Sequence, residues 1–276
     1  MSEEKKQEKI TTKIWREEPE SDNPFAASVC YCSGFDVYGD LLGKASYIEY
    51  LYLLFKLEPP TREQAKLLEG LAVGLANPGP RDHSVRAAMS AGAGGSTHAS
   101  ALIAAIGVGA GNLNGGREVY TAINYWRQCG ADLDAWVTMI KEPPVEERAD
   151  VWHHMEHAPG FDPNGASCPK PVRQFLEYLS SVSPGGSLLW LNKNREALEK
   201  TADCPLAMSG VAAAALNDLE FTADQAEIIY MLLRLPGAAA HSLEQEKLGW
   251  RRYPFFADGL KLTNDPGPVN DKKESV

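Results

Sequence analysis

Hydrophobic side chains recur every three or four residues along most of this chain, which is the spacing of helices that bury one face. The stretch from Asp40 to Lys56 shows the pattern first, and Ser46 is a candidate N-cap for its second half. Pro59 and Pro60 then stop the run. Since no strand-like alternation of useful length occurs, the pattern predicts a mainly α fold.

Capping signals predict where further helices begin. Thr61 with Gln64, and Thr222 with Gln225, have the spacing of a capping box, in which each residue satisfies a backbone N–H of the other. Pro236 should kink or restart the helix that follows Thr222. Other helices are expected at about 83–94, 97–108, 117–129, 172–180, 188–200 and 209–219, with short ones in 130–160, a turn at 112–116 and an irregular loop at 159–171.

The two ends of the chain differ from this helical middle. Residues 1–9 and 264–276 are polar and charged, and we expect both to be disordered tails. The start lacks the apolar segment of a signal peptide, and the most lipid-like stretch, 87–110, is too rich in glycine for a membrane span. We therefore expect a cytoplasmic protein without membrane contact.

A formal net charge of -10 narrows the possible partners. An acidic surface repels a phosphate backbone, so we expect no binding to nucleic acid. A local cluster of arginines can still hold a small anionic ligand against this net field.

The cysteines are odd in number and scattered, which argues against a disulfide framework. Cys30 and Cys32 lie close together but lack the second pair that a zinc site needs. We expect thiols at Cys30, Cys32, Cys129, Cys168 and Cys204, no metal site and no covalently bound cofactor.

Six short motifs follow one another along the chain. They are Gly34-Phe-Asp with Leu41-Leu-Gly-Lys and Ser46-Tyr-Ile-Glu-Tyr-Leu-Tyr-Leu-Leu; Leu57-Glu-Pro-Pro-Thr with Gln64; Asn112-Leu-Asn-Gly-Gly; Pro159-Gly-Phe; Pro205-Leu-Ala-Met-Ser-Gly210; and Arg234-Leu-Pro-Gly-Ala-Ala-Ala-His241 with Glu244-Gln245. In this order, over roughly residues 10–256, they resemble the citrate synthase and citryl-CoA lyase superfamily in its short, lyase-like form.

The resemblance implies a citrate-synthase-like fold of two helical domains that works as a homodimer. It places a small domain at 118–208 and builds a large domain from 10–117 and 209–263. It also implies the ligands, which are a small carboxylic acid and an acyl-CoA thioester that serves as substrate.

The same resemblance implies that this chain lacks the catalytic residues of the family. The family uses an aspartate and two histidines to remove an α-proton from a thioester and to stabilise the enolate oxygen. At the matching positions this chain has Asn114, Pro163 and Ser209, and it has Pro78 where the family has a further histidine. Four changes in separate motifs predict altered chemistry or none.

The catalytic candidates are the residues now in or beside those positions. Asn114 cannot move a proton near neutral pH, but its amide can donate a hydrogen bond to an enolate-like oxygen. Ser209 needs a base within about 3 Å to act as a nucleophile. Asp162, beside Pro163, is either a replacement base or an aspartate that caps a turn.

The candidates for substrate binding are two arginines and two histidines. Arg234 matches a carboxylate-binding arginine of the family and Arg251 lies near the position of another, although an ion pair is the alternative for both. His241 belongs to a retained motif, where it packs or contacts substrate. His157 precedes the Pro-Gly turn, and its spacing from His154 would suit two metal ligands, although we expect no metal.

Three functions stay open. In the first, the chain is a diverged enzyme that makes or breaks a carbon–carbon bond between an acyl-CoA and a carboxylic acid, by Claisen-type chemistry. In the second, it is a catalytically inactive homologue that binds CoA or a carboxylate as a regulator, or that pairs with an active paralogous subunit. In the third, it is a lyase or hydrolase that uses Ser209 on another substrate.

Overall fold

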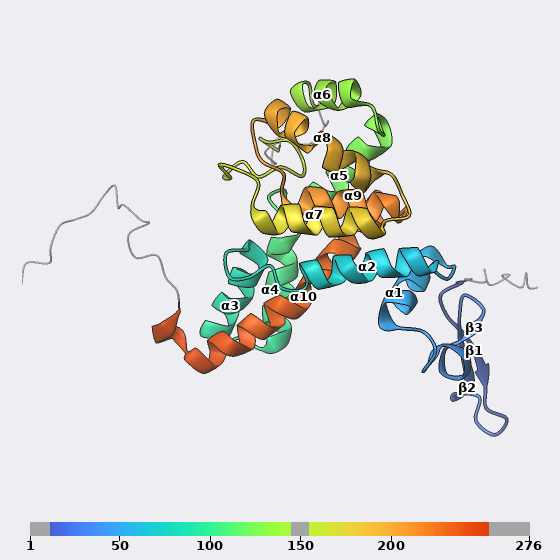
Figure 1. Cartoon of the computed structure of the whole chain (residues 1–276). Helices are drawn as coiled ribbons and strands as arrows, with labels where there is room; N and C mark the ends of the chain where they lie inside the picture. Colours follow the sequence, from blue (N-terminus) through green and yellow to red (C-terminus); the bar gives the residue numbers. More distant parts are fainter. Residues whose placement is uncertain (1–11, 145–154, 254–276) are drawn as a thin grey trace, which may run out of the picture.

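The computed structural model of the chain describes residues 12–144 and 155–253, and α-helices dominate it, as the hydrophobic pattern predicted (Figure 1). The predicted tails at 1–9 and 264–276 lie outside the described residues. The α-helices in the described ranges are α1 (Tyr47–Lys56), α2 (Arg62–Leu75), α3 (His83–Ala93), α4 (His98–Gly109), α5 (Gly116–Cys129), α6 (Leu133–Lys141), α7 (Lys170–Val182), α8 (Ser187–Ala202), α9 (Met208–Asp218) and α10 (Ala223–Leu248).

Capping boxes fix the N-termini of three helices. At α1 the Ser46 hydroxyl accepts a hydrogen bond from the Glu49 N–H, and the Glu49 carboxylate accepts one from the Ser46 N–H. The two pairs predicted for α2 and α10 make the same reciprocal bonds. These predictions are confirmed, and each cap stabilises its helix by about 1 kcal/mol.

The helix α1 begins later than the hydrophobic pattern predicted. Val37–Leu41 forms a single π-helical turn, and Gly43 has a φ of +81°, in the left-handed region. The α-helix starts only at Tyr47. The prediction of a helix from Asp40 is wrong because apolar residues keep helical spacing across a glycine whose backbone leaves the helix.

A small β-sheet, which the hydrophobic pattern did not predict, precedes the helices. Its strands β1 (Arg16–Pro19), β2 (Ala27–Cys32) and β3 (Phe35–Asp36) pair antiparallel in the order β1-β2-β3. Only Cys32 of β2 is buried. Because neither face of the sheet is well covered, its strands lack the alternation of apolar and polar residues that marks a half-buried strand.

One large hydrophobic cluster joins most of the helices. Its buried members include Leu51 of α1, Leu68 of α2, Leu176 of α7, Leu198 of α8 and Ile229 of α10. The cluster extends over segments assigned to both predicted domains. The division into a large and a small domain therefore stays a prediction.

A smaller cluster lies where α3 and α4 pack against α10 (Figure 1). Its buried members are Val85, Ala88, Met89, Ala105 and Ala238. Since the first half of α10 belongs to the large cluster and Ala238 to the small one, this helix connects the two parts of the core.

The helix α10 continues through Pro236, so the predicted restart at this residue is wrong, and the alternative of a kink stays a prediction. Proline removes one N–H from the helix ladder. The next residue, Gly237, donates its N–H to the Ala76 carbonyl at the end of α2, at 2.7 Å. A Cβ on Gly237 would lie only 2.5 Å from that oxygen, so the glycine allows α2 to contact the middle of α10.

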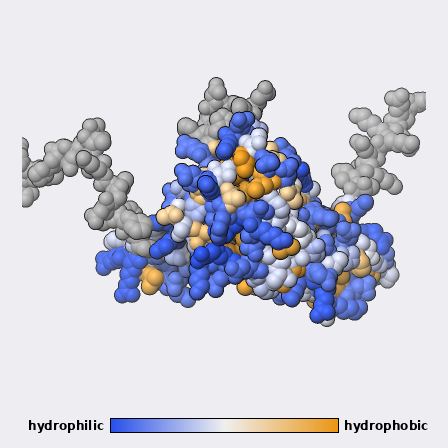
Figure 2. Space-filling view, turned by 45° about the horizontal axis from the view of Figure 1, so that its top comes forward, coloured by the Kyte–Doolittle hydropathy of each residue, from blue (hydrophilic) through white to orange (hydrophobic). Residues whose placement is uncertain are grey.

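Most of the surface seen in Figure 2 is hydrophilic, in keeping with the net charge of -10. Within residues 12–144 and 155–253, no helix combines the length and the apolar character needed to cross a membrane. Ile103 and Ile106 of α4 are nevertheless exposed, and their spacing puts both on one face of the helix.

Gly237→Ala should lower the free energy of unfolding by about 2 kcal/mol, because the added Cβ meets the backbone of Ala76 and Asn77. Urea titration measures this change. Ala240→Gly, at an exposed position of the same helix, is the matched control and should cost only about 1 kcal/mol through helix propensity. Unchanged stability of Gly237→Ala would contradict the close contact between α2 and α10.

Candidate functional site

A buried glutamate, Glu118, lies where three of the four motifs with substituted residues meet. Its side chain is fully buried in the first turn of α5. Its Oε2 accepts a hydrogen bond from the Asn114 N–H at 2.5 Å. Its Oε1 accepts from the Gly160 N–H at 2.7 Å and from the Ser209 hydroxyl at 3.0 Å. Glu118 thus brings the predicted residues Asn114 and Ser209 to one place.

The backbone conformation of Asn114 directs its N–H toward Glu118. Asn114 has a φ of 52°, in the left-handed region, which asparagine adopts more readily than most residues. A Cβ on the next residue, Gly115, would collide with the Gly111 carbonyl, so this tight turn requires a glycine. The predicted turn at 112–116 is confirmed, and it leads directly into α5, whose positive N-terminal end favours the Glu118 carboxylate.

The loop that carries Asp162 pairs with the segment before α9. The Ala207 N–H donates to the Gly160 carbonyl at 2.9 Å, and the Asp162 N–H donates to the Pro205 carbonyl at 2.8 Å. The Asp162 carboxylate accepts from the Asn164 N–H at 2.9 Å and so caps a turn. This is one of its two predicted roles, and a role as base stays a prediction.

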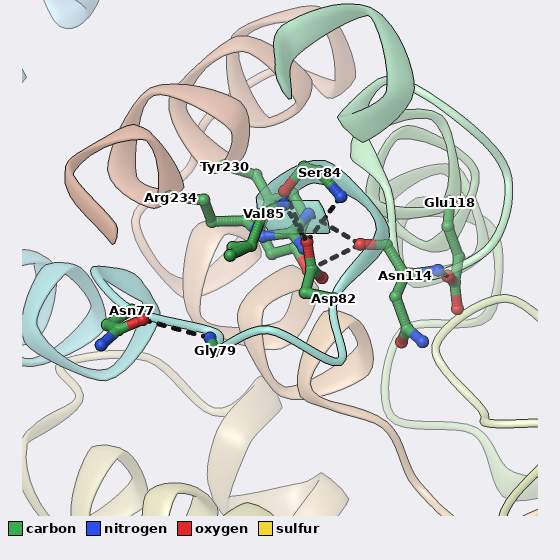
Figure 3. A network of polar contacts seen from close by, with 9 residues as sticks. All are labelled: Asn77, Gly79, Asp82, Ser84, Val85, Asn114, Glu118, Tyr230 and Arg234. Carbon is green, nitrogen blue, oxygen red and sulfur yellow. Dashed lines mark hydrogen bonds and ion pairs between the residues drawn. The ribbon is translucent and has the colours of Figure 1, made fainter. Parts of the chain in front are cut away.

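The Arg234 guanidinium is buried, and both of its terminal nitrogens are engaged. Nη1 donates to the Asn114 carbonyl at 2.7 Å, and Nη2 forms an ion pair with Asp82 (Figure 3). Asp82 also caps α3 by accepting from the Ser84 and Val85 N–H groups. A ligand carboxylate would have to compete with Asp82 for this arginine, so ligand binding by Arg234 stays a prediction.

Tyr230 completes this polar network. Its hydroxyl donates to the Asn114 carbonyl at 3.2 Å, and the Arg234 Cζ lies 4.7 Å from the centre of its ring. Burial raises the pKa of the Tyr230 phenol well above its usual range, so the hydroxyl stays protonated and can donate at neutral pH. The Asn114 carbonyl therefore accepts two hydrogen bonds, while its side-chain amide points away from Arg234 (Figure 3).

His157 approaches the Glu118 carboxylate from the loop before Pro159. Its Nε2 lies 3.6 Å from Glu118 Oε1, and its side chain is only 8% exposed. This buried nitrogen has no hydrogen-bond partner among the described residues. His157 is also one of the residues that line a cavity of about 410 Å³, whose wall includes Asn112, Arg117, Thr121, Tyr125 and Cys204.

His241 and Arg251 lie farther along the chain from this network. His241, about two turns after Arg234, has its Nε2 3.1 Å from Asn77 Oδ1. Arg251 is exposed beyond the end of α10, and its Cζ lies 5.2 Å from the centre of the Trp250 ring. Within the described chain neither residue is joined to Glu118, and a substrate contact by either stays a prediction.

Glu118 and Asp82 were not predicted from the sequence, although each leaves a signal there. Glu118 shares the buried stripe of α5 with Ala122 and Tyr125, and a carboxylate on such a stripe needs polar partners. Asp82 directly precedes the helix expected from residue 83, in the position where aspartate is a preferred N-cap.

The potential metal ligands and the cysteine thiols of the described chain are two other kinds of reactive group. In the part of the chain that the structure describes, no group of three or more His, Cys, Asp or Glu side chains could hold a metal ion. Burial raises the pKa of the Cys168 and Cys204 thiols, which lowers the fraction of reactive thiolate. His154, the possible second ligand beside His157, lies outside the described residues.

Solved structures share this fold, whereas no protein-family model and no curated protein sequence matches the chain. Citryl-CoA lyase from Hydrogenobacter thermophilus aligns with a TM-score of 0.70 at 17% identity, over 94% of this chain and 96% of the lyase. ATP citrate lyase from Methanothrix soehngenii, solved with citrate and coenzyme A, aligns with a TM-score of 0.70 at 18% identity, over 98% of this chain and 44% of that one. Citrate synthase from Thermoplasma acidophilum, solved with carboxymethyl coenzyme A and oxaloacetate, aligns with a TM-score of 0.53 at 16% identity, over 82% and 60% of the two chains.

The chain therefore has the helical fold of citryl-CoA lyase and citrate synthase, as the order of its motifs predicted. It spans nearly the whole length of the citryl-CoA lyase but less than half of the ATP citrate lyase. At identities of 16–18% the likeness defines the fold, so the reaction has to be inferred from the residues of the site.

Ser209→Asp, which introduces the residue type of the resembled family, should lower the free energy of unfolding by about 3 kcal/mol or more. Ser209 is fully buried with its hydroxyl 3.0 Å from Glu118, so a second carboxylate would meet a like charge away from water. Urea titration measures the loss. Adding Glu118→Gln to this variant removes one of the charges and should recover most of the stability, whereas wild-type stability of Ser209→Asp alone would contradict the contact.

Proposed function

We propose that the chain binds an acyl-CoA thioester and a small carboxylic acid, and that it forms or breaks a carbon–carbon bond between them by Claisen-type chemistry. The observation that carries this proposal is the meeting of Asn114, Gly160 and Ser209 on Glu118, beside a cavity of about 410 Å³. A cavity of this size suits a small-molecule substrate. The ATP citrate lyase of the same fold was solved with citrate and coenzyme A, which supports this class of ligand.

An arginine on the cavity wall supports an anionic ligand. Arg117 lines the cavity, and its Cζ lies 4.0 Å from the centre of the Tyr120 ring. A guanidinium can bind a carboxylate or phosphate oxygen through paired N–H donors. Because the whole chain carries a net charge of -10, such a local cation is needed to attract an acidic thioester.

A second candidate function is that of a catalytically inactive homologue, which binds CoA or a carboxylate as a regulator or pairs with an active paralogous subunit. Arg234 supports this candidate, because its terminal nitrogens are engaged by Asp82 and Asn114. Ser209 supports it as well, since its fully buried hydroxyl cannot reach a substrate. The same burial argues against Ser209 as the nucleophile of a hydrolase.

The exposed face of α4 supports assembly into a homodimer. Ile103 is 69% exposed and Ile106 is 39% exposed, in a helix otherwise made mainly of small residues. Large apolar side chains on such a face can pack against the same helix of a second copy. A paralogous chain could use the same face, and both this partner and a cytoplasmic location stay predictions.

Calorimetry tests the proposed ligands. Coenzyme A and acetyl-CoA, with and without citrate, should bind to the purified chain. Arg117→Gln should weaken this binding by about tenfold, because it removes a charge-assisted hydrogen bond. Arg127→Gln, at an exposed arginine of the same helix, is the matched control and should bind like the wild type.

Turnover separates the two candidate functions. Formation of a larger acyl-CoA from acetyl-CoA or propionyl-CoA with oxaloacetate, pyruvate or 2-oxoglutarate is measured by mass spectrometry, and cleavage of citryl-CoA is measured in the reverse direction. Turnover by the pure chain supports the enzyme. Binding without turnover supports the inactive homologue, and the absence of binding to every CoA species would overturn both.

Light scattering should give a mass of twice 30.1 kDa for the chain in solution. Ile103→Glu should shift this mass to that of one chain, because it places a charge in the proposed interface. Val73→Glu changes an apolar residue of α2 that is 76% exposed, and it should leave the dimer intact. A wild-type chain that is monomeric at micromolar concentration would rule out the homodimer.

A further inference from the structure

The buried Glu118 carboxylate requires a compensating group, and His157 is placed to supply one. The hydrogen bonds to Glu118 come from neutral donors, namely the N–H groups of Asn114 and Gly160 and the hydroxyl of Ser209. Among the described residues, the basic group paired with this carboxylate is His157, with Nε2 3.6 Å from Oε1. Because a buried charge without a polar partner is costly, the Glu118 carboxylate favours a proton on the Nε2 that faces it, and it stabilises the imidazolium that forms when Nδ1 takes up a second proton.

The position of the His157 ring distinguishes its two nitrogens. Nε2 is buried against the carboxylate, so the proton belongs on this nitrogen. In this tautomer the lone pair is on Nδ1, the nitrogen that does not pair with Glu118. His157 is one of the residues that line the cavity, so a ligand bound there can approach a histidine whose other ring nitrogen faces an acid. This is the arrangement in which a carboxylate makes histidine an effective base.

We propose that His157, oriented by Glu118, takes up and returns the substrate proton in this cavity. The inference rests on the proposed function and names the group that replaces the lost histidines and aspartate. His157 is the catalytic residue in this scheme, and Glu118 is a positioning residue that acts through it.

The proposed step balances in atoms and electrons. In the bond-forming direction, His157 Nδ1 takes a proton from the carbon next to the thioester carbonyl, the C–H pair becomes the C=C bond of an enolate, and the carbonyl π pair moves to oxygen. The enolate oxygen pair then re-forms the thioester carbonyl while the C=C pair bonds to the carbonyl carbon of the second substrate, and the π pair of that carbonyl moves to its oxygen to give an alkoxide. The proton passes from Nδ1 to the new alkoxide, and the ring ends neutral. Cleavage is the same sequence in reverse.

Other groups near the cavity suit this task less well. Glu118 is fully buried and cannot reach a ligand. Asp162 uses its carboxylate to cap a turn, and Ser209 donates its hydroxyl to Glu118. His157 combines a place on the cavity wall with a buried orienting acid.

Exchange of the methyl protons of acetyl-CoA in D2O tests proton removal without a second substrate. The methyl signal in proton NMR should decay with the wild type. His157→Gln should slow this decay by about 100-fold or more, which is the contribution of a general base, while the Kd for acetyl-CoA stays within about threefold. Added imidazole should partly restore exchange by His157→Ala, a rescue that a purely structural role does not predict.

Two further variants test the pairing. Glu118→Asp keeps the charge but withdraws it by one methylene, and it should slow exchange by about tenfold at unchanged Kd. His98→Gln is the matched control, because His98 also pairs with a glutamate, Glu246, at 3.9 Å, but is exposed on α4. His98→Gln should exchange at the wild-type rate. Circular dichroism confirms that each variant is folded.

The outcomes separate this inference from the proposed function. Exchange at the wild-type rate in folded His157→Gln would overturn the role of His157, and the same result in folded Glu118→Asp would overturn that of Glu118. Binding of acetyl-CoA to the wild type without exchange would also overturn the inference, yet it would leave the proposed class of ligand intact. If acetyl-CoA does not bind, the proposed function fails first and this inference fails with it.

Discussion

A fully buried carboxylate holds together three segments that are far apart in the sequence. The partners of Glu118 include Gly160 and Ser209, which lie 42 and 91 residues further along the chain. Because water cannot replace a lost partner at a fully buried oxygen, each of these hydrogen bonds fixes the position of its segment. The loop before α5, the loop after His157 and the start of α9 therefore form one polar centre.

The same centre gives the residues that differ from the resembled family a structural role in the fold. The Asn114 carbonyl, in the turn next to Glu118, accepts a hydrogen bond from Arg234 Nη1. Asp82 forms an ion pair with Nη2 of the same arginine. In this closed network the substituted residues serve structure through their backbones and hydroxyl groups. Among the described residues, His157 is the histidine that pairs with Glu118 in this network, and it is also one of the residues that line the cavity.

Much of the fold could be predicted from the sequence, because capping pairs and motif order are local signals. Ser46, Thr61 and Thr222 mark helix starts within three residues of their partners. The strands could not be predicted, since the sheet lacks a well-buried face. The uninterrupted course of α10 through Pro236 could not be predicted for another reason. The next residue, Gly237, donates its N–H to Ala76, which lies at the end of a helix more than a hundred residues away in the sequence. The site was predicted as a set of separate positions, and the buried acid that unites them was not.

The left-handed backbone conformation at Asn114 limits which residue types can replace this asparagine without strain. With a φ of 52°, the position favours glycine, asparagine, aspartate and histidine, and it penalises β-branched or bulky residues. A histidine codon becomes an asparagine codon by one nucleotide change, so imidazole chemistry can be lost or regained at this turn with little cost to folding. The geometry of the turn thus allows the side chain to change among these residue types while the backbone of the loop persists.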